Sequence, residues 1–240
     1  MKRSLFLLML ASIALITVPQ IGFAQTVTAE EPLQAEAQAE AEQTKQPKDQ
    51  LMPAEIRRGK TRLRVGEGEN LFWFKKEAES SCKLYGSDEK EVAAFSFKGK
   101  TLKAKSPSGE DLFEVKPKDQ KVMILDAKTG KELFKLKLKL ADGKIDFYLP
   151  NDKRAYRIKK KDYGWRLEDN SGNTLFRAKS KPGKIVLRDP QDKTVLYSKD
   201  IKQPLPLVFY KMKELSKAQK AACAIFFMTP PKKSSKQVNE

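Results

Sequence analysis

The sequence of 240 residues contains no histidine and only two cysteines. Without histidine the chain cannot form a Ser-His-Asp triad, a Cys-His pair, an HExxH zinc site or any other imidazole site. Two cysteines are too few for a four-cysteine zinc site or for a small fold held together by several disulfides. The apolar content of 40% nevertheless suffices for one ordinary core. These absences remove the commonest catalytic and metal-binding constellations and leave a folded domain to explain.

No apolar run in the chain is long enough to cross a bilayer as a helix. The longest run, residues 5–18, has 14 residues, whereas a membrane-spanning helix needs roughly 20. Lys2 and Arg3 precede this run, and Ala24 ends a small-x-small tripeptide. This order is typical of a secretory signal peptide, residues 1–24, that is cleaved after Ala24. We therefore expect a secreted or periplasmic protein; the alternative is that the segment is retained as an anchor.

Two segments flank the candidate domain and contain little that could join a core. Residues 25–55 are rich in Ala, Glu and Gln, and residues 25–50 carry six acidic residues against two lysines. Such a composition cannot bury enough apolar area to offset the entropy lost on ordering, so we expect a disordered acidic tether before a folded domain at 56–228. Residues 229–240 are predicted to form a disordered polar tail. Because the whole chain has a net charge of +17, the folded part is strongly basic.

A pattern of turn residue, apolar–aromatic pair and basic residue recurs through the domain. Its aromatic members are Phe113, Phe134, Tyr156, Phe176 and Tyr197, at spacings of 21, 22, 20 and 21, with weaker copies at Phe72 and Phe95. Each repeat has room for two strands, and residues 134–140 alternate strictly between apolar side chains and lysine. Period-2 alternation is typical of a strand with one buried face and one solvated face. The repeats therefore predict a mostly β domain built as an antiparallel β-meander.

One element near the C-terminus departs from this pattern. Ser216 and Gln219 have the spacing of a capping box, and residues 221–228 are apolar on every side. Such a helix, predicted at 216–228, must be enclosed, and a closed sheet of about a dozen strands is wide enough to enclose it. Two alternatives stay open. The helix could close one end of a β-sandwich, or the repeats could form a propeller of about three or four blades, which leaves the helix without a place.

Consecutive hairpins with a turn followed by Leu-Phe-x-x-Lys, such as Leu112-Phe113…Lys116, and then a hydrophobic helix resemble the tubby C-terminal-like superfamily. That superfamily includes the LURP-one-related proteins and the phospholipid scramblases. The resemblance covers about residues 60–228 and implies a closed antiparallel barrel of about 12 strands around a mostly apolar helix. The resemblance assigns no catalytic motif and no functional residue to this chain. Binding to a lipid surface is implied by analogy only.

Basic side chains recur at outward positions of the predicted strands, where they would form a continuous basic wall. Lys160 and Lys161 extend this wall at a strand end. A basic wall attracts polyanions, and outside the cytoplasm we expect acidic lipid head groups or an anionic envelope polymer rather than nucleic acid. The alternative is that these cations only keep the strands soluble, which interspersed acids such as Glu114, Glu132 and Glu168 favour. The predicted anionic-ligand-binding residues are Lys103, Lys105, Lys135, Lys137, Lys139, Arg157, Lys159, Arg177 and Lys179.

The two cysteines are a candidate disulfide. Cys82 is expected at an inward-facing strand position and Cys223 in the enclosed helix, and oxidising compartments often join such pairs. The bond would close a loop of about 140 residues and would contribute on the order of 4 kcal/mol in the chain-entropy model. The alternative is two buried thiols that pack as small apolar groups.

Few routes to catalysis remain. Carboxylates for a catalytic pair are present at Asp146, Asp152, Asp162, Glu168 and Asp169, but acids beside turns are usually turn formers. No Gly-rich loop precedes a helix, so no phosphate cradle is expected. We therefore predict a non-enzymatic binding module without a cofactor. The alternatives are a structural envelope or scaffold protein that binds a protein partner through the tether, and a carboxylate-dependent enzyme.

Overall fold

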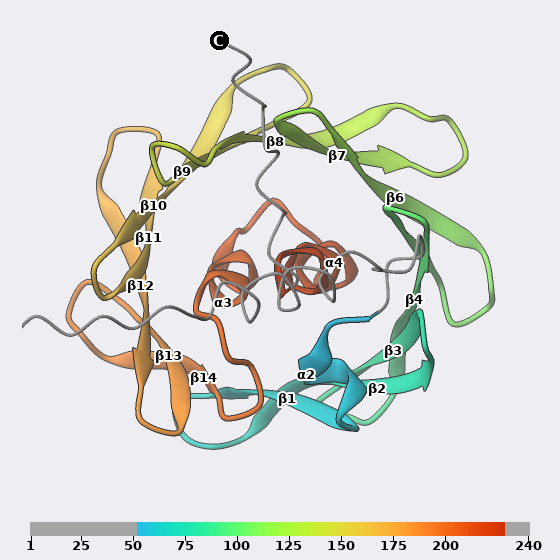
Figure 1. The fold of residues 1–240 in the computed structure, drawn as a ribbon, viewed down its shortest axis with the longest axis horizontal. Helices are drawn as coiled ribbons and strands as arrows, with labels where there is room; N and C mark the ends of the chain where they lie inside the picture. Colours follow the sequence, from blue (N-terminus) through green and yellow to red (C-terminus); the bar gives the residue numbers. More distant parts are fainter. Residues whose placement is uncertain (1–51, 229–240) are drawn as a thin grey trace, which may run out of the picture. The chain divides into compact units, whose positions relative to one another are not determined.

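Fourteen antiparallel strands close into a barrel, because each strand pairs with its neighbours in the sequence and the first pairs with the last (Figure 1). The structure, a computed structural model, describes residues 52–228, which belong to one compact unit. The strands are β1 (Lys60–Val65), β2 (Asn70–Ala78), β3 (Ser81–Gly86), β4 (Glu91–Lys98), β5 (Thr101–Lys105), β6 (Asp111–Lys118), β7 (Lys121–Asp126), β8 (Glu132–Lys139), β9 (Lys144–Tyr148), β10 (Arg154–Lys161), β11 (Gly164–Asp169), β12 (Thr174–Lys181), β13 (Lys184–Arg188) and β14 (Thr194–Ser198).

The prediction of about 12 strands is wrong by one hairpin, since the barrel has 14. Every even-numbered strand carries one turn–aromatic repeat, and the two weaker copies, at Phe72 in β2 and Phe95 in β4, are complete hairpins. The resemblance implies about 12 strands and the sequence pattern has room for roughly 12 to 14, whereas the seven repeats supply two strands each. The closed ladder of hydrogen bonds also excludes the sandwich and the propeller.

Alternation along each strand separates the core from the surface. In β8, Leu136 is fully buried and Leu138 is 7% exposed, whereas the alternating Lys135, Lys137 and Lys139 lie on the outer face. The same alternation runs through β5, where Leu102 and Ala104 are buried. The period-2 pattern of the sequence is therefore confirmed, and the inward side chains line a closed apolar interior.

Helices fill this interior (Figure 1). α4 (Lys217–Met228) contacts β4, β5 and β6, while α3 (Leu205–Val208), continued by the 3₁₀ helix η1 (Phe209–Lys211), contacts β11, β12 and β13. The sequence predicted α4 but not α3 or η1. Because the diameter of a barrel grows with the number of strands, a single helix would leave an empty space beside it. The second helical segment occupies that space, and the rings of Phe209 and Phe227 stack with centroids 5.2 Å apart.

α4 begins with the predicted capping box. The amide of Gln219 donates to Oγ of Ser216 at 3.3 Å, and the amide of Ser216 donates to Oε1 of Gln219 at 2.9 Å. The helix starts at Lys217, with Ser216 as its N-cap, and every side chain from Ala221 to Met228 is buried. The prediction of an enclosed apolar helix is therefore confirmed.

The two ends of the barrel have different turns. A turn of four or five residues precedes each even-numbered strand and defines the long-turn end; a turn of two residues, or four between β8 and β9, follows each even-numbered strand up to β12 and defines the short-turn end. All seven long-turn hairpins contain a register shift. At the short-turn end only the β2–β3 hairpin contains one. Since β-bulges bend strands and increase their twist, the long-turn hairpins supply regularly spaced curvature.

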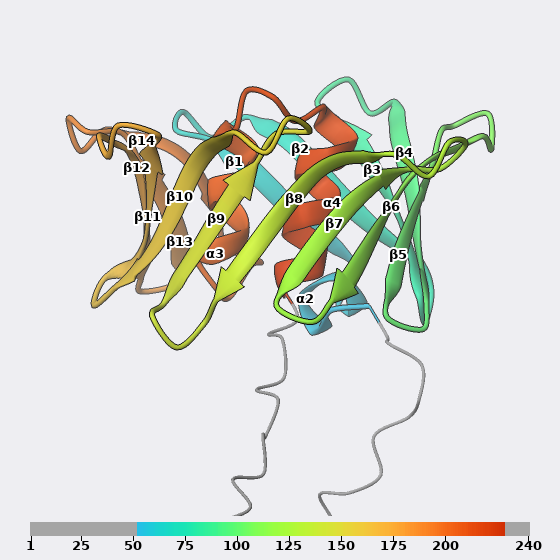
Figure 2. The same ribbon diagram turned by 90° about the horizontal axis from the view of Figure 1, so that it is seen from above.

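A short helix, α2 (Ala54–Arg57), lies at the short-turn end, where the β8–β9 turn is also found (Figure 2). Met52 and Ile56 are fully buried, and the amide of Met52 donates to the carbonyl of Glu79 at 3.0 Å. The folded domain therefore includes Met52, so it does not begin at residue 56 as predicted. The predicted signal peptide, residues 25–51 of the predicted tether and the predicted tail lie outside the described residues.

The seam between β1 and β14 combines a short backbone ladder with side-chain hydrogen bonds. The two strands share two paired positions. Beyond them, the hydroxyl of buried Ser198 donates to the carbonyl of Arg62 at 2.7 Å, and the carboxylate of Asp200 accepts the amide of Arg62 at 2.8 Å. On the other side of the ladder a Cβ on Gly66 would lie 2.2 Å from the carbonyl oxygen of Thr194, so the backbones approach too closely for any other residue.

We expect Ser198→Ala to lower the free energy of unfolding by about 1–3 kcal/mol, because the carbonyl of Arg62 and the amide of Ile201 lose a buried partner. Urea denaturation measures this change. Ser180→Ala, at an exposed position of β12, is the control and should change the free energy by no more than about 0.5 kcal/mol. Equal effects of the two substitutions would contradict a role for Ser198 in closure.

Candidate functional site: basic surfaces of the barrel

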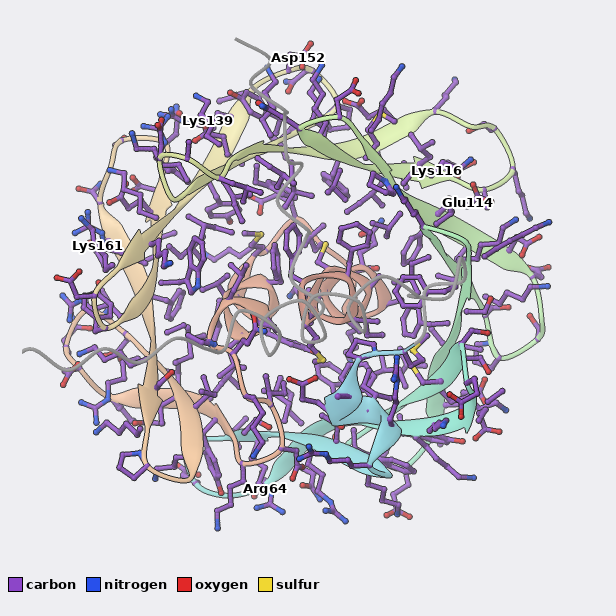
Figure 3. All side chains as sticks on the ribbon, viewed as in Figure 1. Arg64, Glu114, Lys116, Lys139, Asp152 and Lys161 are labelled. Carbon is purple, nitrogen blue, oxygen red and sulfur yellow. The ribbon has the colours of Figure 1, made fainter. Side chains whose placement is uncertain are left out.

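The nine predicted anion-binding residues come from β5, β8, β10 and β12 and lie on the outer face of the barrel. Figure 3 shows one of them, Lys139, directed away from the helices of the interior. β9 lies between β8 and β10, and β11 lies between β10 and β12. These intervening strands place Asp146 and Glu168 on the same outer face. The predicted continuous basic wall is therefore interrupted by acids.

Eight of the nine cations form ion pairs with carboxylates. Pairs of this kind cancel much of the field that the cations would exert on a distant anion. The three acids that favoured a bland interpretation of the wall all take part. The pairs are Lys103–Glu114 (2.8 Å), Lys105–Asp111 (3.5 Å), Lys135–Glu132 (3.2 Å), Lys139–Asp146 (3.2 Å), Arg157–Asp146 (2.6 Å), Lys159–Glu168 (2.8 Å), Arg177–Asp192 (4.0 Å) and Lys179–Asp192 (3.3 Å).

Lys137 differs from the other eight, because no ion pair joins it to a carboxylate within residues 52–228. Its Nζ lies 4.4 Å from the centroid of the Tyr148 ring on the neighbouring strand β9. An ammonium group over an aromatic face is stabilised by the ring quadrupole. The Tyr148 ring therefore holds Lys137 in place, but it does not neutralise the positive charge of this lysine.

Asp146 is the most deeply enclosed carboxylate of the wall, with 1% of its side chain exposed. Burial alone would raise its pKa, but hydrogen bonds from Arg157 and Lys139 outweigh burial and hold the pKa of Asp146 below its ordinary value. Glu168 has a similar environment, with Nζ of Lys159 at 2.8 Å and Nη2 of Arg166 at 2.6 Å. The long cationic side chains therefore cover these acids and join adjacent strands.

Four of the five carboxylates considered for catalysis have structural partners, whereas Asp162, in the β10–β11 turn, forms no ion pair within residues 52–228. Asp146 and Glu168 form the ion pairs described above, Asp152 pairs with Lys135, and Asp169 accepts the amide of its own turn at Asn173 at 2.8 Å. Within residues 52–228, no group of three or more His, Cys, Asp and Glu side chains is arranged to hold a metal ion. The carboxylates with partners thus take part in ion pairs between strands or in hydrogen bonds within turns.

Cys82 in β3 and Cys223 in α4 both lie in the core, each 1% exposed. The structure has them as free thiols, which is the alternative that the sequence left open, and the disulfide is not formed. Burial raises the pKa of each thiol to about 12. Both groups are therefore protonated and shielded, as expected of thiols that pack as small apolar groups.

Charge is distributed unevenly between the two ends of the barrel. Counting each hairpin turn with one residue on either side, the short-turn end has nine lysines and four acids, whereas the long-turn end has eight basic residues and thirteen acids. The two sets of turns thus carry net charges of +5 and −5. This segregation becomes visible in the sequence only when alternate turns are assigned to opposite ends of the barrel. The signal for this assignment is the alternation in turn length, two residues (four between β8 and β9) against four or five.

A group of exposed lysines at the short-turn end has no ion-pair partner within residues 52–228, and we call this group the basic rim. Two of its members, Lys160 and Lys161, were predicted as an extension of the wall. Figure 3 shows Lys161 on the outside of the barrel. The basic rim comprises Lys98, Lys100, Lys118, Lys121, Lys160, Lys161, Lys181 and Lys184.

The long-turn end has an open groove of about 640 Å³ between three turns, the end of η1 and the segment after it. Leu149 and Phe176 give it an apolar floor, and Arg154, Lys211 and Lys213 give it cations. Nζ of Lys211 lies 5.7 Å from the ring centroid of Phe176. The groove also contains Asp169 and Glu214, so its charges are mixed. It is a weaker candidate for an anionic surface than the basic rim.

The sequence matches no protein-family model and no curated protein. Among solved structures, a protein from Arabidopsis thaliana is similar at 15% identity and a TM-score of 0.31, over 44% of this chain and 77% of that one. An alternansucrase in complex with isomaltononaose is similar at 15% identity and a TM-score of 0.16, over 55% of this chain and 13% of that one. Within residues 52–228, no helix combines the length and the apolar character needed to cross a membrane.

We expect Asp146→Asn to lower the free energy of unfolding at pH 7 by about 1–3 kcal/mol, because Arg157 and Lys139 lose an enclosed anionic partner. The pKa of Asp146 is lower in the folded state than in the unfolded state. Its stabilisation is therefore complete above the unfolded pKa and is lost as the pH falls through the folded pKa. Urea denaturation of both proteins from pH 7 to about pH 3 should show the difference shrinking. A difference that does not change with pH would contradict this account.

Proposed function

We propose that this protein is a non-enzymatic module that binds an acidic surface, an anionic lipid membrane or an envelope polymer, through the basic rim of its barrel. The observation that carries the proposal is the segregation of charge, with nine lysines against four acids at the short-turn end. The outer wall is a weaker site, because eight of its nine predicted cations are paired with carboxylates.

The location of the basic rim at one end of the barrel also favours it as the binding site. Its lysines occupy four of five neighbouring turns, from β4–β5 to β12–β13, and all of them are exposed. The ends of a barrel present several turns to a flat partner at once, whereas a curved wall presents only a few strands. Because each lysine near an anionic surface contributes about 1 kcal/mol, several acting together suffice for attachment that weakens with salt.

We also infer that the barrel is a variant of the tubby C-terminal-like fold. Two features support this: a closed antiparallel meander, and an apolar helix that follows the last strand and lies inside the barrel. The chain departs from the plan that the resemblance implies by one additional hairpin and by a second helical segment, α3 with η1. The proposed secreted or periplasmic location rests on the sequence of residues 1–24, outside the described part.

Changing Lys118, Lys121, Lys160 and Lys161 to glutamine should weaken binding to vesicles of phosphatidylcholine and phosphatidylglycerol by at least about tenfold, because four cations leave the surface. Co-sedimentation at about 0.05 M and about 0.5 M salt measures this, and the higher salt should release the wild-type protein. The chain from Gln25 is used, since the apolar run at residues 5–18 would bind lipid by itself.

The matched control changes Lys128, Lys131, Lys153 and Lys193 to glutamine. These four exposed lysines lie in turns of the long-turn end, so the control has the same net charge as the rim variant. We expect its affinity to stay within about threefold of wild type. Equal loss in both variants would show that net charge alone matters. Absence of wild-type binding to these vesicles and to polyphosphate would overturn the proposal.

A further inference from the structure

Two large apolar side chains are exposed within residues 52–228, and both stand among the turns of the basic rim. Leu140, in the β8–β9 turn, is 45% exposed, and Tyr163, in the β10–β11 turn, is 38% exposed. Single apolar residues scattered over a surface need no explanation. These two, however, occupy neighbouring turns at one end of the barrel, which is the end with the excess of lysine.

The two turns lie side by side. The amide of Lys160, at the end of β10, donates to the carbonyl of Gly143 in the β8–β9 turn at 2.7 Å. A Cβ on Gly143 would lie 3.0 Å from the Cβ of Lys160, so no side chain separates the backbones there. From β12, Nζ of Lys179 lies 5.3 Å from the centroid of the Tyr163 ring. The turns that carry Leu140 and Tyr163 are therefore part of one supported surface.

Basic residues flank both turns, although Lys139 and Lys144 pair with Asp146 and Asp142 and only the lysines before Tyr163 have no ion-pair partner within residues 52–228. Lys139 precedes Leu140 in the chain and Lys144 follows its turn, while Lys160 and Lys161 stand just before Tyr163. Lysine and tyrosine both combine an apolar body with a polar tip, so they suit a boundary between water and hydrocarbon. Leu140, the first residue of the β8–β9 turn, thus exposes apolar area at the end of the barrel that carries the basic rim.

We propose that Leu140 and Tyr163 enter the interfacial layer of an anionic bilayer while the basic rim binds its head groups. This rests on the proposed function and narrows the partner to a membrane. A soluble polyanion is bound by charge alone and offers no apolar layer, so the two exposed side chains would gain nothing from it. A bilayer removes their apolar area from water at the same time as it neutralises the lysines around them.

The first test compares the wild-type chain from Gln25 with the double variant Leu140→Ser, Tyr163→Ser. Affinity for vesicles of equal parts phosphatidylcholine and phosphatidylglycerol should fall about tenfold or more, because the apolar contribution is lost. Affinity for polyphosphate should stay within about twofold, because no lysine is changed. Urea denaturation of the double variant, with the same cooperative transition as wild type, checks that it is folded.

A second measurement places each turn relative to the bilayer. Since Cys82 and Cys223 are buried, single variants Leu140→Cys and Tyr163→Cys can be labelled selectively with an environment-sensitive fluorophore. Gln191→Cys, in the exposed β13–β14 turn at the long-turn end, is the control. Acidic vesicles should shift the emission of the first two labels to the blue and leave the third unchanged.

The outcomes separate this inference from the proposed function. Equal vesicle binding by the double variant and the wild type, or an equal shift at Gln191→Cys, would overturn membrane insertion and leave binding to an acidic surface intact. Loss of wild-type binding to both vesicles and polyphosphate would overturn the proposed function as well. Loss of vesicle binding alone in the double variant, with shifts confined to the two rim labels, would support insertion.

Discussion

Closure of the sheet between β1 and β14 is the constraint on which the rest of the structure depends. A closed ladder removes both sheet edges, but it also encloses a space that the chain must fill. α3, η1 and α4 fill that space, and their side chains are almost entirely buried. Closure with an even number of antiparallel strands also brings the start of β1 and the end of β14 to the same end, the short-turn end. Closure therefore gathers the alternate turns of the meander into one ring at each end.

Closure depends on local chemistry that is absent from the repeats. The repeats build hairpins one after another, and each hairpin pairs through its own turn. The first and last strands have no turn between them, so the seam needs residues that meet from opposite ends of the domain. Ser198 and Asp200 hydrogen-bond to the backbone of Arg62, and Gly66 permits close approach to Thr194. These side chains replace ladder hydrogen bonds where the paired stretch is short.

Sequence reasoning recovered the elements whose signal is local. Alternation of leucine and lysine predicted strands, the Ser216–Gln219 box predicted the start of α4, and its all-round apolar character predicted enclosure. It missed α3, because two prolines and four apolar residues have no helical periodicity. It identified the outward cations but not their neutralisation. Opposed pairs such as Lys103 and Glu114 form only in one strand register. The register follows from the length of each turn, and the sequence indicates these lengths only after each turn has been assigned to one end of the barrel.

The contrast between the wall and the basic rim follows from the geometry of hairpins. Side chains on a strand have cross-strand neighbours about 5 Å away, so a lysine there is readily paired with an acid on the next strand. The rim lysines at the strand ends instead face other lysines or uncharged residues across the ladder, as in the pairs Lys118–Lys121 and Lys181–Lys184, so no acid neutralises them and their charge stays available to a partner. Cations in ion pairs join adjacent strands and stabilise the barrel. Unpaired cations repel one another, and binding of an anion relieves this repulsion. The proposed anionic partner would neutralise these eight lysines, whereas solubility of the barrel is the alternative role that the sequence leaves open.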